Sequence, residues 1–189
     1  AIVLIKESTR VSFTVMETDS NQQYRFSVPG PELAESEWRA GLWQLKALAP
    51  RPEYIVLSGG LPPGAPSDFY GRIARWAQAN EIQIILDTHH EPLRQAISPG
   101  VFPIKPDVRE LRQLTQQKLA GEEEQCQALR HLIDEGAAQY IVLSLGADGA
   151  IFASATGTQR LPAPSVTVRS KVGAGDSMVG SLVWALVQG

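Results

Sequence analysis

The sequence has little of what extracellular, nucleic-acid-binding or membrane proteins depend on. It contains one cysteine, Cys126, so no disulfide can form within the chain, which agrees with a reducing, cytoplasmic compartment. The formal net charge is −3, which gives no basic footprint for nucleic acid. No apolar run approaches the length of a membrane span, and the first residues lack the pattern of a signal peptide. We therefore expect neither nucleic acid nor a membrane as a partner.

Two common nucleotide-binding motifs are also missing. A Gly-Lys-Ser/Thr sequence is absent, which excludes a Walker-type P-loop. Gly173-Ala174-Gly175 is followed by a glycine only five residues later, at Gly180, and it stands at the far end of the chain. The dinucleotide fingerprint has another spacing and belongs in an early strand-turn-helix unit, so a dehydrogenase is disfavoured.

What is present suits one ordinary folded domain. The chain has 189 residues, of which 43% are apolar and 20% charged. It starts at Ala1, without a methionine, directly before the strand-like run of residues 2–5, and it stops at Gly189 just after a helix-like run. We expect it to be a piece of a longer protein.

The first thirty residues predict a β-hairpin. Two β-rich runs, 11–16 and 22–28, are joined by a polar turn and closed by Pro29-Gly30-Pro31. Because two strands alone are marginally stable in water, we expect the hairpin to pack against something else, such as another subunit.

From residue 32 onward, helical patterns alternate with short apolar strands. This order predicts a mostly parallel sheet covered by helices on both faces. We expect helices over 35–48, 67–79 (with Ser67 as N-cap), 91–97, 107–116, 122–135 and 178–187, and strands over 54–57, 82–86, 101–104, 140–143, 150–153, 158–161 and 166–168.

Polar or glycine-rich motifs fall at five strand exits or helix starts. In α/β sheets, ligands bind at the carboxyl ends of the strands, so five such coincidences predict one shared site. The motifs are Ser58-Gly59-Gly60, Asp87, Lys105-Pro106-Asp107, Ser144-Leu145-Gly146 and Gly173-Ala174-Gly175-Asp176.

The last of these motifs is the most informative. Small residues before a helix let successive N–H groups converge on an anion, most often phosphate. Asp176 directly follows this predicted cradle, where a carboxylate repels phosphate. Two interpretations stay open: a first-turn helix-capping acid, or a general base that takes a proton from a hydroxyl as it attacks a phosphoryl group.

The remaining motifs also have plain structural interpretations. Asp107 and Glu110 lie three residues apart and can cap a helix, or they can order Mg²⁺ beside a lysine, Lys105, that contacts nucleotide phosphates. The glycines at 146 and 149 can form a plain tight turn. We interpret the three histidines, His89, His90 and His131, as not being metal ligands.

Together these motifs resemble the ribokinase-like, PfkB-type carbohydrate kinases, in the order and spacing of that family. The resemblance covers essentially the whole chain and is nearest to the minor bacterial 6-phosphofructokinase branch. It rests on residues 172–180, Lys105-Pro106-Asp107-x-x-Glu110, Ser144-Leu145-Gly146-Ala147-Asp148-Gly149, residues 58–64, and residues 23–30 with Thr9-Arg10 before them.

The resemblance implies a ribokinase-like three-layer α/β sandwich and transfer of the γ-phosphoryl of MgATP to a primary hydroxyl of a sugar phosphate. Asp176 matches the family's base, and the amides of Gly173, Ala174 and Gly175 match its anion hole. The matching nucleotide and metal residues are Lys105 at the ATP phosphates, Asp107 beside them, Glu110 ordering Mg²⁺ through water, and Ser144, Gly146 and Gly149 along the nucleotide.

On the acceptor side, Arg10 matches the arginine that grips the phosphate already on the sugar, and its bidentate fork suits that task. Ser58, Gly59 and Gly60 match the acceptor loop. Residues 1–31 correspond to a lid hairpin with its connection, which in this branch also forms a homodimer contact. Residues 32–189 correspond to the α/β domain, truncated at both ends.

Three positions depart from the family pattern: Asp107 replaces the usual Asn, Gly60 replaces a serine that contacts the sugar, and Lys171 replaces a threonine. The family's N-terminal sugar-binding part and its C-terminal part, which closes over adenine and often carries a monovalent-cation site, are not in this sequence.

Fructose 6-phosphate is the leading acceptor by resemblance, with fructose 1-phosphate and tagatose 6-phosphate as rivals. Arg10 recognises a phosphate without specifying which sugar carries it. An alternative of another class is a nucleotide- or sugar-binding protein without catalysis. Against it, a pure binder gains nothing from Asp176 beside phosphate.

Overall fold

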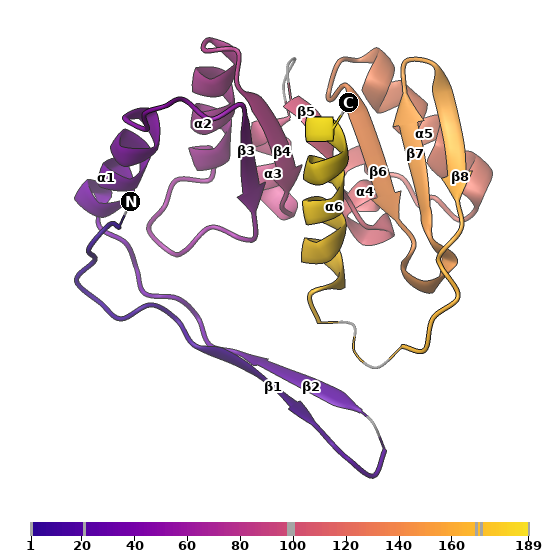
Figure 1. The fold of residues 1–189 in the computed structure, drawn as a ribbon, viewed down its shortest axis with the longest axis horizontal. Helices are drawn as coiled ribbons and strands as arrows, with labels where there is room; N and C mark the ends of the chain where they lie inside the picture. Colours follow the sequence, from indigo (N-terminus) through magenta and orange to yellow (C-terminus); the bar gives the residue numbers. More distant parts are fainter. Residues whose placement is uncertain (1, 21, 98–100, 169, 171, 189) are drawn as a thin grey trace.

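The computed structural model describes residues 2–20, 22–97, 101–168, 170 and 172–188, with the backbone alone at position 102. Two separate sheets are present, one of two strands and one of six, together with helices that flank the larger sheet (Figure 1). In chain order the elements are β1 (Ser12–Met16), β2 (Gln23–Ser27), α1 (Glu35–Lys46), β3 (Tyr54–Ser58), α2 (Phe69–Gln78), β4 (Gln83–Asp87), α3 (His90–Ala96), β5 (Val101–Ile104), α4 (Val108–Thr115), α5 (Glu122–Asp134), β6 (Tyr140–Ser144), the 3₁₀ turn η1 (Gly146–Asp148), β7 (Ala150–Ser154), β8 (Gly157–Leu161) and α6 (Ala174–Gln188).

The predicted hairpin is confirmed. β1 and β2 pair antiparallel with Phe13 opposite Phe26 and Val15 opposite Tyr24, and the hairpin extends away from the larger sheet (Figure 1). Opposite residues of a strand pair share a face, so these four side chains form one apolar face of the hairpin. The two phenylalanine rings stack with centroids 5.1 Å apart.

The larger sheet keeps its strands in chain order, from β3 to β8. β3, β4, β5 and β6 pair in parallel, which confirms the predicted parallel part. β7 and β8 then pair antiparallel, because the short connections at 145–149 and 155–156 leave no room for a crossover helix. The parallel strands place all their carboxyl ends along one edge.

Helices cover both faces of this sheet, which gives the three layers of the predicted α/β sandwich. In Figure 1, α6 lies in front of the sheet while α3, α4 and α5 lie behind it. The phenol of Tyr54 on β3 donates a hydrogen bond to the Leu186 carbonyl of α6, 3.3 Å away. The core between sheet and helices contains fully buried aliphatic side chains, among them Ile84, Leu86, Ile104, Leu111, Leu129, Ile141 and Leu143.

Two sequence-based predictions of local structure are wrong, and the strand-like residues 2–5 are not a strand. α2 begins at Phe69 with Asp68, not Ser67, at the N-cap position, and the Asp68 carboxylate pairs with Arg72 instead of capping. Residues 166–168, which follow Pro162 and Pro164, form no strand and pair with neither sheet. Residues 2–5 form no strand either and pair with no sheet edge.

Of the helices in the described ranges, none is long and apolar enough to cross a membrane. Lys171 lies outside the described residues, so its departure from the family pattern has no structural account.

Candidate functional site

The predicted motifs meet at the carboxyl edge of the parallel strands. Ser58 at the end of β3 lies opposite Asp87 at the end of β4, and the Gly59 amide donates to the Asp87 carbonyl over 2.9 Å. Asp107 and Ser144 form an isolated parallel bridge on the next two strand exits. The structure thus brings four of the five motifs to one edge.

Lys105 connects the fifth motif to this edge. Its side chain is 8% exposed, and its Nζ lies 2.9 Å from Oδ1 of Asp87, whose side chain is 17% exposed. A Cβ placed on Gly175 would lie 3.7 Å from the same Nζ. The start of α6 therefore faces a buried ammonium group, which adds positive charge to the N–H groups of the helix end.

The glycine turn leads directly into the first turn of α6. Gly173 has a φ of 79°, in the left-handed region that favours glycine, and its carbonyl accepts the first helical hydrogen bond from the Ser177 amide over 2.8 Å. Asp176 lies in the first turn of α6 and is exposed. Across the described residues, its carboxylate has no hydrogen bond or ion pair and does not cap the helix. This arrangement favours the general-base interpretation over the capping one.

Asp107 is a helix cap, as the plainer interpretation predicts. Its carboxylate accepts from the Glu110 amide over 2.8 Å, and the Glu110 carboxylate accepts from the Asp107 amide over 2.7 Å. This reciprocal capping box starts α4. Burial raises the pKa of Glu110, and the neighbouring carboxylates of Asp107 and Asp87 act in the same direction. A half-buried carboxylate whose ionised form is disfavoured by burial and by neighbouring carboxylates suits a cation ligand, because a cation offsets both effects.

The nucleotide-side residues have clear structural tasks as well. Ser144 donates its amide and its hydroxyl to the Pro106 carbonyl, over 2.9 and 3.3 Å. Gly149 has a φ of 91°, and a Cβ there would lie 2.1 Å from the Leu161 carbonyl oxygen, so close packing against β8 requires glycine. Gly146 is also left-handed and opens the turn η1. Asp107 and Ser144 line one pocket of about 440 Å³ together with Arg109 and Arg160.

Arg10 and Gly60, fifty residues apart, line one pocket on the acceptor side. We call this pocket, about 370 Å³ in volume, the acceptor pocket; Gly30, Leu33 and Leu61 also line it. The Arg10 side chain is exposed and has no ion pair within the described part of the chain. Its guanidinium is therefore available to an anion.

Ser58 and Gly59, which the resemblance assigns to substrate binding, accept hydrogen bonds through their backbone carbonyls. Their carbonyl oxygens both accept from the Tyr70 hydroxyl, over 3.1 and 3.2 Å, and the Gly59 carbonyl also accepts from Thr88 over 2.7 Å. These bonds fix the acceptor loop. Burial raises the pKa of Tyr70, which keeps its hydroxyl a donor.

One candidate residue has no role in the sequence-based prediction. Arg25 of β2 lines a pocket of about 420 Å³ together with Thr14, Gln23, Gly175 and Asp176. The hairpin therefore faces the start of α6 with its polar side. The signal in the sequence is the alternation along the hairpin, in which Thr14, Gln23 and Arg25 occupy the face opposite Phe13 and Phe26.

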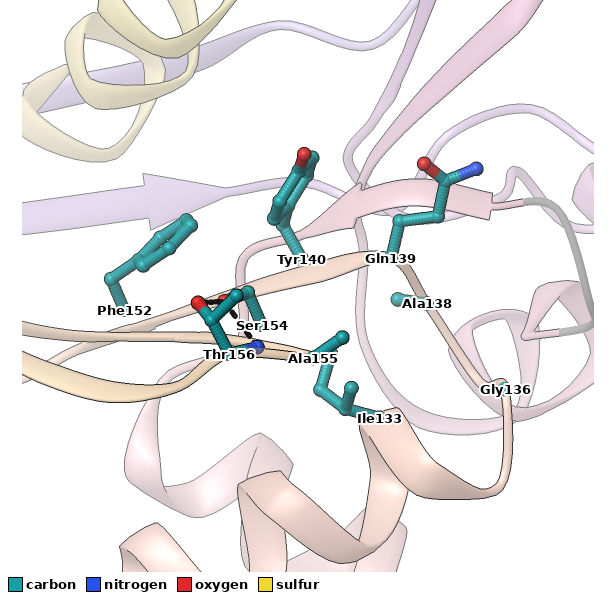
Figure 2. A pocket seen from close by; sticks show the side chains of 9 residues that line it. All are labelled: Ile133, Gly136, Ala138, Gln139, Tyr140, Phe152, Ser154, Ala155 and Thr156. Carbon is teal, nitrogen blue, oxygen red and sulfur yellow. Dashed lines mark hydrogen bonds between the residues drawn. The ribbon is translucent and has the colours of Figure 1, made fainter.

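A separate pocket of about 620 Å³ lies at the other end of the sheet (Figure 2). It is lined by Tyr140 at the start of β6 and by Ser154 and Thr156 at the end of β7, whose hydroxyls lie 2.8 Å apart. The Tyr140 and Phe152 rings stack on one side of it, with centroids 5.6 Å apart. Its lining residues include no acid, lysine, arginine or histidine, so we assign the function to the carboxyl edge.

The fold and the site together define an α/β protein of the ribokinase-like class, with a glycine turn and a buried lysine at the carboxyl edge of its sheet. A sequence model described as pfkB family carbohydrate kinase matches residues 1–189. The chain belongs to this family, which confirms the resemblance seen in the motifs.

Similar proteins within the family are phosphofructokinases. The ATP-dependent 6-phosphofructokinase isozyme 2 of Mycobacterium tuberculosis is 42% identical over 188 residues, which are 100% of this chain and 55% of that protein. The 1-phosphofructokinase of Borreliella burgdorferi is 30% identical, over 99% of this chain and 60% of its own length. A solved structure, the tetrameric inhibited form of phosphofructokinase-2 from Escherichia coli, superposes with a TM-score of 0.92 at 33% identity and covers 100% of this chain and 62% of its own. The chain thus spans little more than half the length of these relatives.

Proposed function

We propose that the protein containing this chain transfers the γ-phosphoryl group of MgATP to a primary hydroxyl of fructose 6-phosphate. The observation that carries the proposal is the position of the buried Lys105 ammonium at the glycine turn that precedes Asp176. Similarity to a 6-phosphofructokinase over the whole chain supports the acceptor.

In this proposal Asp176 accepts the proton of the attacking hydroxyl. The hydroxyl oxygen then forms a bond to phosphorus while the bond to the ADP oxygen breaks. The amides of Gly173, Ala174 and Gly175 and the Lys105 ammonium stabilise the negative charge of the transferred group, because they are fixed in place before the reaction begins. Arg25, which shares a pocket with Asp176, adds a second cation on the hairpin side.

Metal binding would fall to Glu110. Burial of this half-buried carboxylate raises its pKa, which means that its ionised form is disfavoured. A divalent cation bound beside it would favour the ionised form again. Glu110 would hold Mg²⁺ through water, and the bound ion would supply charge neutralisation at the phosphates. A monovalent cation and the cytoplasmic location both stay predictions.

On the acceptor side, Arg10 would hold the phosphate already on the sugar, next to Gly60 in the acceptor pocket. Fructose 1-phosphate remains the rival acceptor, because a 1-phosphofructokinase is also similar to the chain. Tagatose 6-phosphate is a second rival acceptor. A nucleotide- or sugar-binding protein without catalysis is the candidate of another class, and an exposed Asp176 that makes no bond in the described structure favours catalysis over it.

We also propose that residues 1–31 act as a lid. The apolar face of the β1–β2 hairpin would join two copies of the chain. Phe13, Val15, Tyr24 and Phe26 are each about half exposed on one face of an isolated two-strand sheet. An apolar face of this kind is unfavourable in water and marks an interface. Residues 32–189 would form the α/β domain.

The test of the function is a coupled ADP-release assay on the full-length protein with a panel of sugar phosphates. We expect turnover that is highest with fructose 6-phosphate and depends on Mg²⁺. Absence of turnover with every sugar phosphate, together with retained ATP binding, would favour a binding protein without catalysis. The isolated 189 residues should be inactive, because in-line positioning of two substrates needs a complete site.

A further inference from the structure

The imidazole of His89 occupies the space beside Gly60. A Cβ placed on Gly60 would lie 3.3 Å from both Cε1 and Nε2 of His89, so the imidazole would have to shift by a few tenths of an ångström to admit it. Gly60 has no left-handed φ, unlike its neighbour Gly59 at 85°. The backbone therefore does not demand glycine at position 60, whereas the imidazole needs the room that glycine leaves.

The contact between His89 and Gly60 is held by the two strands that carry them. β3 and β4 pair in parallel with Ser58 opposite Asp87 (Figure 1), so the two following turns run side by side. The Gly59 amide donates to the Asp87 carbonyl over 2.9 Å, and the Thr88 hydroxyl donates to the Gly59 carbonyl over 2.7 Å. Thr88 is buried and sits directly before His89, which fixes the start of the histidine side chain.

The ring nitrogens of His89 are free to bind a ligand. His89 is the N-cap residue of α3, yet its side chain makes no capping bond. Among the residues that the structure describes, neither ring nitrogen has a hydrogen-bond partner, and the side chain is half-buried. Its ring meets that of His90 edge to face, with centroids 4.9 Å apart, which restricts the orientation of the imidazole. Gly60, beside which the imidazole lies, lines the acceptor pocket together with Arg10.

We propose that His89 is a substrate-binding residue, whose Nε2 forms a hydrogen bond with a hydroxyl of the acceptor sugar while Arg10 binds the phosphate of the same molecule. Gly60 then contributes space and a backbone N–H. The side chain that contacts the sugar at this place comes instead from His89, which follows the neighbouring strand β4. This inference rests on the proposed function, since it assigns a contact within the acceptor site of that reaction.

The test compares His89→Phe, which keeps a flat ring beside Gly60 but removes both nitrogens, with His89→Gln, whose amide nitrogen can reach the position of Nε2. Both are made in the full-length protein that we expect to contain this chain. The matched control is His131→Phe, the same change at an exposed histidine of α5. Steady-state kinetics with fructose 6-phosphate and calorimetric binding of fructose 6-phosphate are measured for each variant.

We expect His89→Phe to raise KM and Kd for fructose 6-phosphate about two- to thirteenfold, the effect of losing one hydrogen bond, with KM for ATP unchanged. His89→Gln should recover most of this loss, and His131→Phe should behave as the wild type. A His89→Phe variant with wild-type KM and Kd, or one in which the KM values for both substrates rise together, would overturn the assignment. A wild-type protein that phosphorylates none of the sugar phosphates would instead overturn the proposed function, and this inference with it.

Discussion

Lys105 and Asp87 form an ion pair 2.9 Å long at the carboxyl ends of two adjacent parallel strands, with both side chains largely removed from water. Each residue comes directly after or at the end of a strand whose core side chains, Leu86 and Ile104, are fully buried. The pair is therefore held at the ends of two strands that are anchored in the core. Asp87 holds the Lys105 ammonium group next to the start of α6, where both the ammonium and the helix N–H groups can face an anion.

This relationship predicts the effect of removing one partner. Asp87→Ala should lower the free energy of unfolding by about 3 kcal/mol, because it leaves a buried ammonium group without its counter-charge. Lys105→Met/Asp87→Ala should be less destabilised than Asp87→Ala alone. Urea denaturation of the four proteins of this cycle measures the coupling, and additive effects would show that the pair contributes nothing of its own.

Asp176→Asn should retain ATP binding and lose turnover by about 10² to 10⁴, the usual effect of removing a general base. The amide keeps the size of the side chain, so the start of α6 should not change. Stopped-flow or steady-state measurement of kcat in the full-length protein tests this. A kcat within a few-fold of the wild type would remove Asp176 from the role of base.

Arg10→Ala should raise KM for the phosphorylated acceptor far more than KM for ATP. Loss of a hydrogen bond to a charged group costs about 1.5–3 kcal/mol, or about ten- to more than a hundredfold in KM. Arg39→Ala is a matched control, since Arg39 is an exposed arginine of α1 that pairs with Glu35. Equal effects of Arg10→Ala on both substrates would contradict its place in the acceptor site.

Glu110→Gln should weaken Mg²⁺ binding at least about tenfold while leaving the folded chain as stable as the wild type or more so. Burial raises the pKa of Glu110 above its ordinary value, so the folded chain holds this proton more tightly than the unfolded chain. The stability that comes from this group is present below the ordinary pKa and is lost as the pH rises through the raised one. At neutral pH the wild type carries the cost of an ionised, half-buried carboxylate, and the Glu110→Gln variant does not.

Thermal unfolding of Glu110→Gln and the wild type between pH 4 and pH 8 measures this difference. We expect the stability of the wild type to fall relative to that of the variant as the pH rises. A variant that is clearly less stable than the wild type at neutral pH would show that the capping bond to the Asp107 amide needs a charged acceptor.

Phe13→Ser/Phe26→Ser should convert a dimer joined through the hairpins into monomers, because the change removes two stacked aromatic rings from the exposed face. Sedimentation velocity of the full-length protein measures the assembly state. Ser12→Ala/Ser27→Ala, a pair of changes on the opposite face of the same two strands, is the control. A double phenylalanine variant that stays dimeric would place the interface elsewhere.

Much of the fold could be predicted, because the local pattern of apolar residues matches the burial that each segment has in the folded chain. The apolar run at residues 82–86 forms β4 with three fully buried side chains, and the alternating runs before residue 29 form the hairpin. Prediction was wrong where a pairing partner decides: residues 166–168 have the composition of a strand, but they pair with neither sheet of the described structure. Ser67 is a good capping residue in isolation, yet α2 begins two residues later, after Pro66 accepts a turn bond from the Phe69 amide.

The sequence by itself determined the chemistry that this chain can bring together: a glycine turn at a helix start, a lysine and two carboxylates after strands, and an arginine beside a hairpin. Short-range patterns suffice for this, because strand exits and helix starts are local features. Only the tertiary structure decided which of these groups meet. It showed Asp107 as a helix cap, paired Lys105 with Asp87, brought Arg25 to the Asp176 pocket, and set His89 beside Gly60. Those contacts depend on the register of adjacent parallel strands and on the placement of the hairpin, and sequence spacing alone specifies neither.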